Sequence, residues 1–269
     1  MGVSIIESFI CGKKGVPELC EDIISVTDGF IAVIDGVTSK SDRLYNGKSG
    51  GRDGAELVSE AISSLDRNSD CQEALDLIDL AIAKEYCGEL PPPDKRIQAC
   101  AIIYSVEKRQ VWCYGDCQLM INGVFYDHTK MIDRVTSSLR AFVIECYLKN
   151  GGSPEALAER DVGREAIMPY LKEQASLANL EGTFGYPVLD GSGICSKMVK
   201  VYNVNIGDEI ILASDGYPRL CPTLEESERA IFETLETDPL AIKENMQTKM
   251  MKKGDLSFDD RTYIRFKIK

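Results

Sequence analysis

Acidic residues stand at the ends of several apolar, strand-like segments of this 269-residue chain. Residues 30–40 read FIAVIDGVTSK, in which five strand-forming residues run directly into Asp35 and Gly36. The dipeptide Asp-Gly is usually a hairpin turn, but the polar, glycine-rich sequence that follows does not read as a second strand. The sequence therefore predicts that Asp35 lies at a strand end and faces a loop, where functional residues are common.

The same arrangement recurs later in the chain. The segment EIILASDG places Asp215 after an apolar strand, and QVWCYGD places Asp116 after another. In SFDDRTYIRF, Asp259 and Asp260 come directly before a final strand-like run. Each of these residues alone is typical of a solvated turn. Together they favour a single site at which several strand ends meet.

A short hairpin predicts that two of the acids face each other. In EDIISVTDGF, Asp28 and Gly29 form a two-residue turn, and the register of such a hairpin sets Asp22 opposite Asp35. Facing residues have Cβ atoms roughly 4.5–5.5 Å apart, so the two carboxylates repel each other unless a cation lies between them. Carboxylate oxygens suit Mg²⁺ and Mn²⁺, and two such ions about 3.5–4 Å apart activate water and stabilise a phosphoryl oxygen.

The elements that position these acids come in blocks of helices and blocks of strands. Such blocks favour an α+β fold with antiparallel sheets covered by helices. Residues 136–180 look mostly helical but show little apolar periodicity. The remaining pattern predicts helices at 55–67, 71–86 and 222–236, a meander of consecutive strands at 97–106, 110–116, 118–121 and 124–128, and strands at 198–216 and 261–269.

Composition excludes some classes of function. The chain has 31 basic and 43 acidic residues and a net charge of −12, which argues against a nucleic-acid-binding protein. No apolar run approaches membrane-spanning length, and the first residues show no signal-peptide pattern, so no membrane association is expected. The ten cysteines are scattered, and most of them are expected to be buried thiols in a reducing cytoplasm.

Taken in order, these motifs resemble the metal-dependent serine/threonine protein phosphatases of type 2C, the PPM family, and its bacterial members in particular. The motifs are the acidic pair at 21–22, VIDGV, YGDCQLMINGVFY, IGDEIILASDGY and DDRTYIRF, and they span nearly the whole chain. The resemblance implies a four-layer αββα sandwich, in which two antiparallel β-sheets are flanked by helices. It further implies a single domain over residues 1–269 with a variable, flap-like insertion at about 136–180.

The resemblance also implies which residues bind Mg²⁺ or Mn²⁺. Asp35 would bridge two ions and Gly36 would bind one of them through its carbonyl oxygen. Glu21 and Asp22 would hold metal-bound waters. Together with Asp35 they would be the catalytic residues. Asp116 would match the ligand of a third ion. The complete set of expected metal-binding positions is Asp35, Gly36, Asp215, Asp259, Asp22, Glu21 and Asp116.

The implied activity is hydrolysis of phosphoserine and phosphothreonine by attack of a metal-bound water or hydroxide. The substrate would be a phosphorylated protein, and a cognate serine/threonine kinase would be a natural partner. One departure from the family is Pro17, which stands where an arginine usually grips the phosphate. Lys13 or Lys14 could substitute for it, or the two lysines form an exposed turn. The alternative function is a weak or inactive pseudophosphatase that acts as a regulatory binding module.

Overall fold

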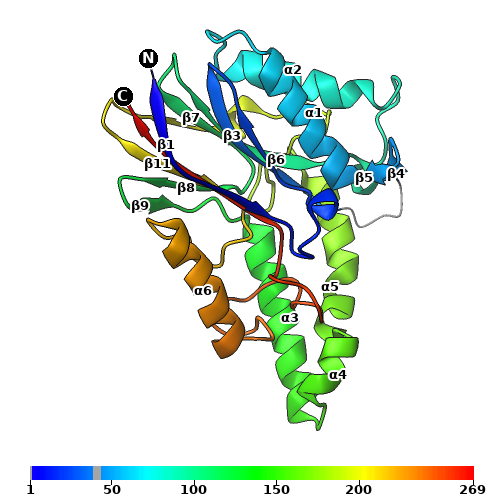
Figure 1. Ribbon diagram of the computed structural model, residues 1–269. Coiled ribbons are helices and arrows are strands. Elements are labelled where there is room, and N and C mark those ends of the chain that lie inside the picture. The colour runs from blue at the N-terminus through cyan, green and yellow to red at the C-terminus, as the bar shows by residue number, and fades with distance from the viewer. Residues whose placement is uncertain (1, 39–43) are drawn as a thin grey trace.

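Two five-stranded antiparallel sheets form the centre of the computed structural model, which describes residues 2–38 and 44–269 (Figure 1). The first sheet has the order β10 (Lys200–Asn203), β7 (Gln110–Tyr114), β6 (Ala99–Ser105), β3 (Phe30–Gly36) and β2 (Ile23–Val26). The second has the order β1 (Val3–Cys11), β12 (Arg261–Ile268), β11 (Glu209–Ala213), β8 (Gln118–Ile121) and β9 (Val124–Tyr126). A small ladder pairs β4 (Leu44–Tyr45) with β5 (Lys48–Ser49).

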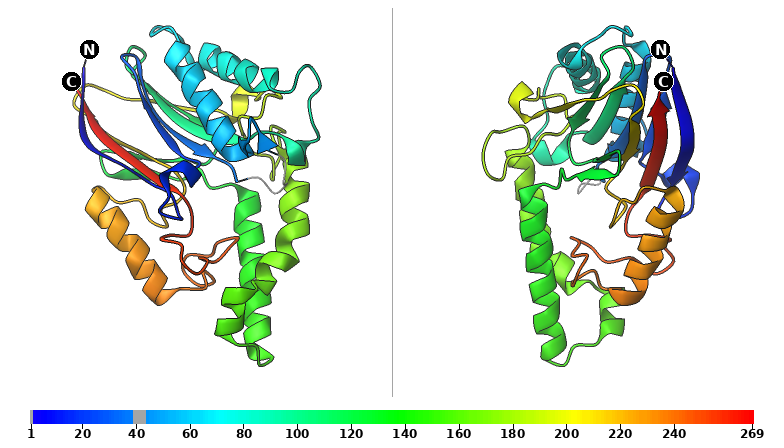
Figure 2. Two further views of the ribbon diagram at one scale, coloured as in Figure 1. Left: turned by 45° about the vertical axis from the view of Figure 1, so that its right-hand side comes forward. Right: turned by 90° about the vertical axis from the view of Figure 1, so that its left-hand side faces the viewer.

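Helices cover the outer faces of both sheets, which confirms the predicted α+β sandwich. Helices α1 (Gly50–Ser64) and α2 (Cys71–Lys84) lie on the first sheet, and α6 (Leu224–Thr237) lies on the second (Figures 1 and 2). Helices α3 (Met131–Lys149) and α5 (Val162–Glu173), joined by the short α4 (Pro154–Glu159), pack together and extend beyond the ends of the sheets. Within the described part of the chain, no helix has the length and apolarity needed to cross a membrane.

Strand β3, which lies between β6 and β2, shows how the core directs a carboxylate. Ile31 and Val33 pack between the two sheets, whereas Ala32 and Ile34 pack toward the helices. Because both faces of the strand are covered, the sequence reads as one continuous apolar run rather than an alternating one. Alternate side chains share a face, so Asp35 continues the row of Ile31 and Val33 and points between the sheets.

Two expectations are wrong, one about how the strands pair and one about where the first long helix begins. The strands between residues 97 and 128 do not form one meander, because β7 belongs to the first sheet and β8 to the second. The chain crosses between the sheets at Gly115, which has φ +113°, and a Cβ there would lie 2.4 Å from the Cys100 sulfur. Helix α1 also begins five residues earlier than expected, at Gly50, where the hydroxyl of Ser49 accepts from the backbone N–H of Arg52.

A buried arginine joins the helical extension to the segment that precedes β12. The side chain of Arg140 in α3 is fully buried, and its Nε donates to Asp161 at 3.0 Å. Its Nη1 donates to the backbone carbonyl oxygens of Leu240, Ala241 and Gln247 at 3.0–3.2 Å. These contacts fix the path of residues 240–248 against the helices, although this segment has no regular secondary structure.

Candidate functional site

The facing pair of acids predicted from the first hairpin is present. The backbone N–H of Thr27 donates to the Phe30 carbonyl at 2.8 Å, and Ile23 pairs with Ile34. This register continues to Asp22 opposite Asp35. Asp22 is 1% exposed: its Oδ2 accepts from the Thr262 hydroxyl at 2.8 Å, and its Oδ1 has no hydrogen-bond partner. Burial raises the pKa of Asp22 to about 8, partly opposed by the hydroxyl donors and reinforced by Asp260.

Asp35 lies at the end of β3 and Asp215 lies just after β11, and the charge of Asp35 acts on Asp215. Burial raises the pKa of Asp35 well above its usual range, and the charges of Asp22, Asp116 and Asp259 raise it further. The pKa of Asp215 is raised by its desolvation and by Asp35. Asp215 is exposed to solvent although it lines a cleft, so the desolvation of its carboxylate is incomplete. The two carboxylates therefore form an electrostatically strained pair that favours a proton or a cation.

The glycines of the two Asp-Gly pairs are required by close backbone approach. A Cβ on Gly36 would lie 2.2 Å from the carbonyl oxygen of Gly51 at the start of α1, and 2.7 Å from that of Glu21. A Cβ on Gly216 would lie 2.0 Å from the carbonyl oxygen of Asp260. No side chain fits at either distance, so each glycine lets a neighbouring acidic segment pack directly beside the strand end.

A lysine holds Asp116 at the point where the chain crosses between the sheets. Lys130, directly before α3, places its Nζ 2.7 Å from the Asp116 Oδ2, and the two side chains are only 13% and 8% exposed. The ammonium group also lies 3.7 Å from Asp133 and 5.1 Å from the centre of the Tyr186 ring. Burial alone would raise the pKa of Asp116, but the charge and hydrogen bond of Lys130 outweigh it, and the pKa is lowered.

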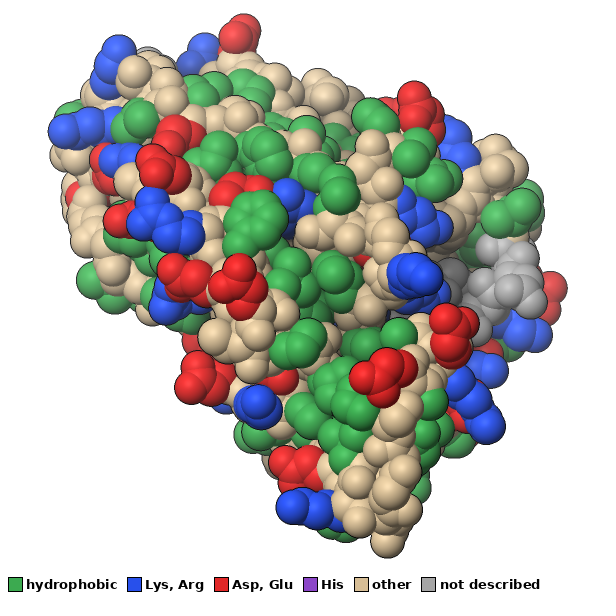
Figure 3. All heavy atoms as spheres, turned by 60° about the horizontal axis from the view of Figure 1, so that its bottom comes forward, with side chains coloured by type: hydrophobic (Ala, Val, Ile, Leu, Met, Phe, Trp, Pro, Cys, Tyr) green, Lys and Arg blue, Asp and Glu red, His purple; other side chains and the backbone are tan. Residues whose placement is uncertain are grey.

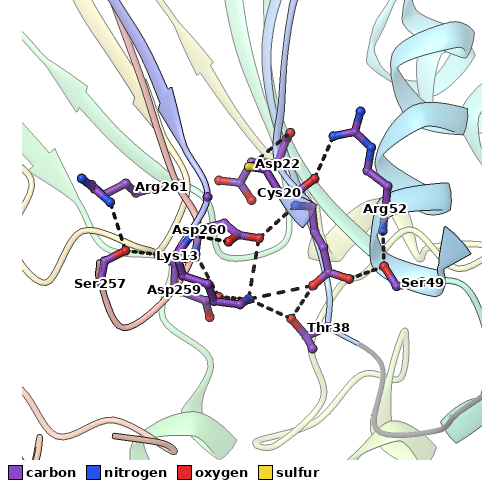
Figure 4. Close-up of polar contacts among 12 residues, drawn as sticks. Lys13, Cys20, Asp22, Thr38, Ser49, Arg52, Ser257, Asp259, Asp260 and Arg261 are labelled. Carbon is purple, nitrogen blue, oxygen red and sulfur yellow. Dashed lines mark hydrogen bonds and ion pairs between the residues drawn. The ribbon is translucent and has the colours of Figure 1, made fainter. Parts of the chain in front are cut away.

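Two lysines contact the carboxylate of Asp259, one at each oxygen, and Figure 4 shows the contact with Lys13. The Nζ of Lys13 lies 2.7 Å from Oδ1, and the Nζ of Lys249 donates to Oδ2. Burial would raise the pKa of Asp259, but these two ammonium groups lower it to about 2. In this structure Lys13 therefore forms an ion pair with Asp259. Its Nζ also lies 3.6 Å from Asp260 Oδ2 and 4.0 Å from Glu21 Oε2. Lys14 is exposed.

Asp260 and Glu21 organise the loops around the acids rather than facing the cleft. The carboxylate of Asp260 accepts from the backbone N–H groups of Lys13 at 2.8 Å and Glu21 at 2.9 Å. The carboxylate of Glu21 accepts from the hydroxyl of Thr38 at 2.6 Å and from that of Ser49 at 2.5 Å. Figure 4 shows this network joining the first loop, the start of α1 and the segment before β12.

A cleft of about 1420 Å³ lies over the strand ends. Its floor carries Asp35, Asp116, Asp215 and Asp259, and its walls come from α3, α5 and residues 243–259. Figure 3 views the molecule from the lower side of Figure 1, where apolar side chains and charges of both signs are mixed on the surface. The strand ends, loops and helical extension thus enclose one depression that has aspartates on its floor and charges of both signs along its walls.

The expected site residues gather at one end of the sheets, and the sequence reasoning missed their cationic partners. Each of Asp22, Asp35, Asp116, Asp215 and Asp259 acts electrostatically on at least one other member of the group. The missed residues are Lys130, Lys249, Thr38 and Ser49. Ser49 carries a visible signal, since a serine before Gly-Gly-Arg-Asp is a plausible helix cap. The two lysines stand in segments with no such signal.

The donor chemistry of this site fits hard divalent cations. All candidate side-chain ligands are carboxylates, Asp22 has a buried oxygen without a donor, and the pKa values of Asp35 and Asp215 are raised. Among the described residues, however, no group of three His, Cys, Asp or Glu side chains is arranged closely enough to hold an ion as it stands. Here lysines contact Asp116 and Asp259, and a hydroxyl group contacts Asp22.

Comparison with known proteins supports the fold independently. No family model and no curated protein matches the sequence. Among solved structures, the chain resembles the catalytic domain of the serine/threonine protein phosphatase PstP in complex with two manganese ions, at 16% identity and TM-score 0.51, with both chains fully covered. It also resembles the serine/threonine phosphatase Stp1 from Staphylococcus aureus, at 13% identity and TM-score 0.52, over 100% of this chain and 96% of that one.

A third similar structure is a bacterial serine phosphatase, at 14% identity and TM-score 0.50, over 98% of this chain and 97% of that one. Identities this low establish the fold and not the activity. The fold implied by the sequence motifs is nevertheless the one found. The chain has the fold of the bacterial serine/threonine phosphatases.

Proposed function

We propose that the protein is a phosphoric monoester hydrolase that removes phosphate from phosphoserine and phosphothreonine in proteins, with Mg²⁺ or Mn²⁺ as cofactor. The observation that carries this proposal is the gathering of four aspartates from separate segments, Asp35, Asp116, Asp215 and Asp259, on the floor of one cleft, with Asp22 buried beside Asp35. A folded protein gains no stability from placing Asp22, Asp35 and Asp215 where their pKa values are raised, so this arrangement points to a functional requirement for cations.

The proposed roles follow from where each group lies. Asp35, Gly36, Asp215, Asp259 and Asp116 would hold the cations directly, with Glu21 and Asp22 holding water molecules beside them. Bound cations would supply a Lewis acid for the phosphoryl oxygens and lower the pKa of water.

The chain's own groups would prepare this site. Asp35 and Asp22 would give up the protons that their raised pKa values retain in the absence of a cation. The network of Asp260 and Glu21 would hold the loops in place, and the ammonium group of Lys13 would turn from Asp259 toward the phosphate. Residues 1–269 would act as one catalytic domain, and residues 136–180 would act as the variable element that selects the substrate. A serine/threonine kinase would supply the phosphorylated protein.

A hydrolysis assay tests this proposal. The purified protein would be incubated with an aryl phosphate and with a phosphothreonine peptide, in Mn²⁺, in Mg²⁺ and in a chelator. We expect hydrolysis with either ion, none with the chelator, and a loss of at least a hundredfold in Asp35→Asn. Asp28→Asn is the matched control, because Asp28 also precedes a glycine but lies exposed in the turn at the other end of β3.

One observation favours the second candidate, a regulatory binding module without turnover. Both oxygens of Asp259 are held by lysines, so the chain itself supplies positive charge where a cation is expected. Metal binding by calorimetry without any hydrolysis of either substrate would support the module and refute the enzyme.

A further inference from the structure

Two lysine-lysine-glycine turns lie side by side at the rim of the cleft. The first is Lys13-Lys14-Gly15 and the second is Lys252-Lys253-Gly254. Both glycines have positive φ, +68° and +94°, which turns the backbone sharply and presents the preceding lysines. The backbone N–H of Leu256, two residues after the second turn, donates to the carbonyl oxygen of Lys13 at 2.6 Å. The two turns are therefore fixed against each other.

Three of these four lysines form no ion pair with the described residues. Lys13 is occupied by Asp259, but Lys14, Lys252 and Lys253 are exposed, and no carboxylate of the described residues lies within 4.0 Å of their ammonium groups. All three line the same cleft as Asp35. Segment 243–255 carries four lysines against two acids, Glu244 and Asp255, in a chain whose net charge is −12. The turns are thus a local excess of positive charge on an acidic protein.

We propose that the two turns bind acidic residues that flank the phosphorylated residue of the substrate. This inference rests on the proposed function, since the phosphate must enter the cleft floor for its neighbours to reach the rim. The exposed ammonium groups of Lys14, Lys252 and Lys253 are complementary in charge to carboxylates, and they attract an acidic segment locally on a chain that is otherwise acidic. The contacts are with exposed ammonium groups, and each is therefore weak and sensitive to salt.

The test compares three phosphothreonine peptides that differ only in flanking Glu, Gln or Lys residues. Binding would be measured by fluorescence anisotropy, and KM by phosphate release. We expect the Glu peptide to bind best, with a preference over the Gln peptide that shrinks as NaCl is raised. In Lys252→Glu/Lys253→Glu we expect KM for the Glu peptide to rise about tenfold. We expect kcat on that peptide and the hydrolysis of an aryl phosphate to stay unchanged.

The matched control is Lys108→Glu/Arg109→Glu, which makes the same charge change in an exposed turn. That turn lies at the other end of the first sheet, since it follows Ser105, the partner of Phe30, whereas Asp35 pairs with Cys100. Equal binding of the Glu and Gln peptides to the wild type, or equal loss of preference in the control, would overturn the inference.

The outcomes also separate the two proposals. Hydrolysis that shows no preference for the flanking charge would support the phosphatase activity and refute the binding role of the lysine turns. Lysine-dependent binding of the Glu peptide without turnover would support the binding role and refute the phosphatase activity.

Discussion

The buried ion pair between Asp116 and Lys130 gives the sharpest quantitative prediction. The perturbation is Lys130→Met, which removes the ammonium group but keeps an apolar stem near the ring of Tyr186. The two charged atoms are 2.7 Å apart and both side chains are almost fully buried. Removing one partner of such a pair leaves an uncompensated charge and costs about 3–5 kcal/mol. We therefore expect the free energy of unfolding of Lys130→Met to fall by about that amount.

The second half of the prediction is that removing both charges restores most of this loss. In Asp116→Asn/Lys130→Met neither member of the pair is charged, so the double variant is expected within about 1–2 kcal/mol of the wild type. Asp116→Asn alone is expected to cost less than Lys130→Met, because Lys130 keeps Asp133 at 3.7 Å. The pattern expected is thus a strongly non-additive double-mutant cycle.

Urea denaturation in the presence of a chelator is the appropriate assay. The single tryptophan, Trp112, is fully buried and reports on the first sheet, and circular dichroism at the same urea concentrations checks that unfolding is two-state. With an m-value of about 3 kcal/mol per M, the midpoint of Lys130→Met should fall by about 1 M or more. A loss below about 1 kcal/mol, or a double variant as unstable as the sum of the single ones, would refute the reasoning.

Three further predictions concern the backbone, pH and the loop network. Gly36→Ala is expected to prevent stable folding, because its Cβ would lie 2.2 Å from a carbonyl oxygen of α1, and the soluble yield and melting temperature would show this. The pKa of Asp22 is about 8 in the native state, so between about pH 4 and 8 the native state holds a proton that the unfolded chain has lost. Without a cation, the free energy of unfolding therefore falls as pH rises through this range. Added Mn²⁺ should therefore raise the melting temperature more at about pH 8 than at about pH 5.5; an equal gain at both would count against a cation at these acids. Asp260→Ala leaves the backbone N–H groups of Lys13 and Glu21 without an acceptor and should cost about 2–4 kcal/mol in urea denaturation, while an unchanged midpoint would show that water replaces the carboxylate.

The parts of the site that could be read from the sequence are those set by local geometry. A two-residue turn fixes hairpin register, so the opposition of Asp22 and Asp35 followed from counting residues. The two strand-terminal Asp-Gly pairs were also visible in the sequence, and the close backbone approaches at Gly36 and Gly216 give a steric reason for their glycines. These features depend on a few neighbouring residues and on backbone sterics.

The parts that could not be read depend on distant segments. Lys130 reaches Asp116 only because the chain crosses between sheets at Gly115, and hydrophobic patterning does not distinguish that crossing from a simple turn. Helix α3 was only loosely expected because its buried positions include Thr136, Ser137 and Arg140, which weaken apolar periodicity. Burial there is achieved by hydrogen bonds and ion pairing, which leave no repeat in the sequence.

The Arg140 contacts have a mechanical consequence. Because one guanidinium group holds Asp161 and three backbone carbonyls of the 240–248 segment, the helical extension and that segment are expected to shift together as one lever. The far end of this lever carries Lys249 and, three residues on, the second lysine turn. A ligand that tilts α3 and α5 would thereby move the ammonium group of Lys249 toward or away from Asp259. Binding at the tip of the extension would then change the surroundings of the acids without any change in the sheets.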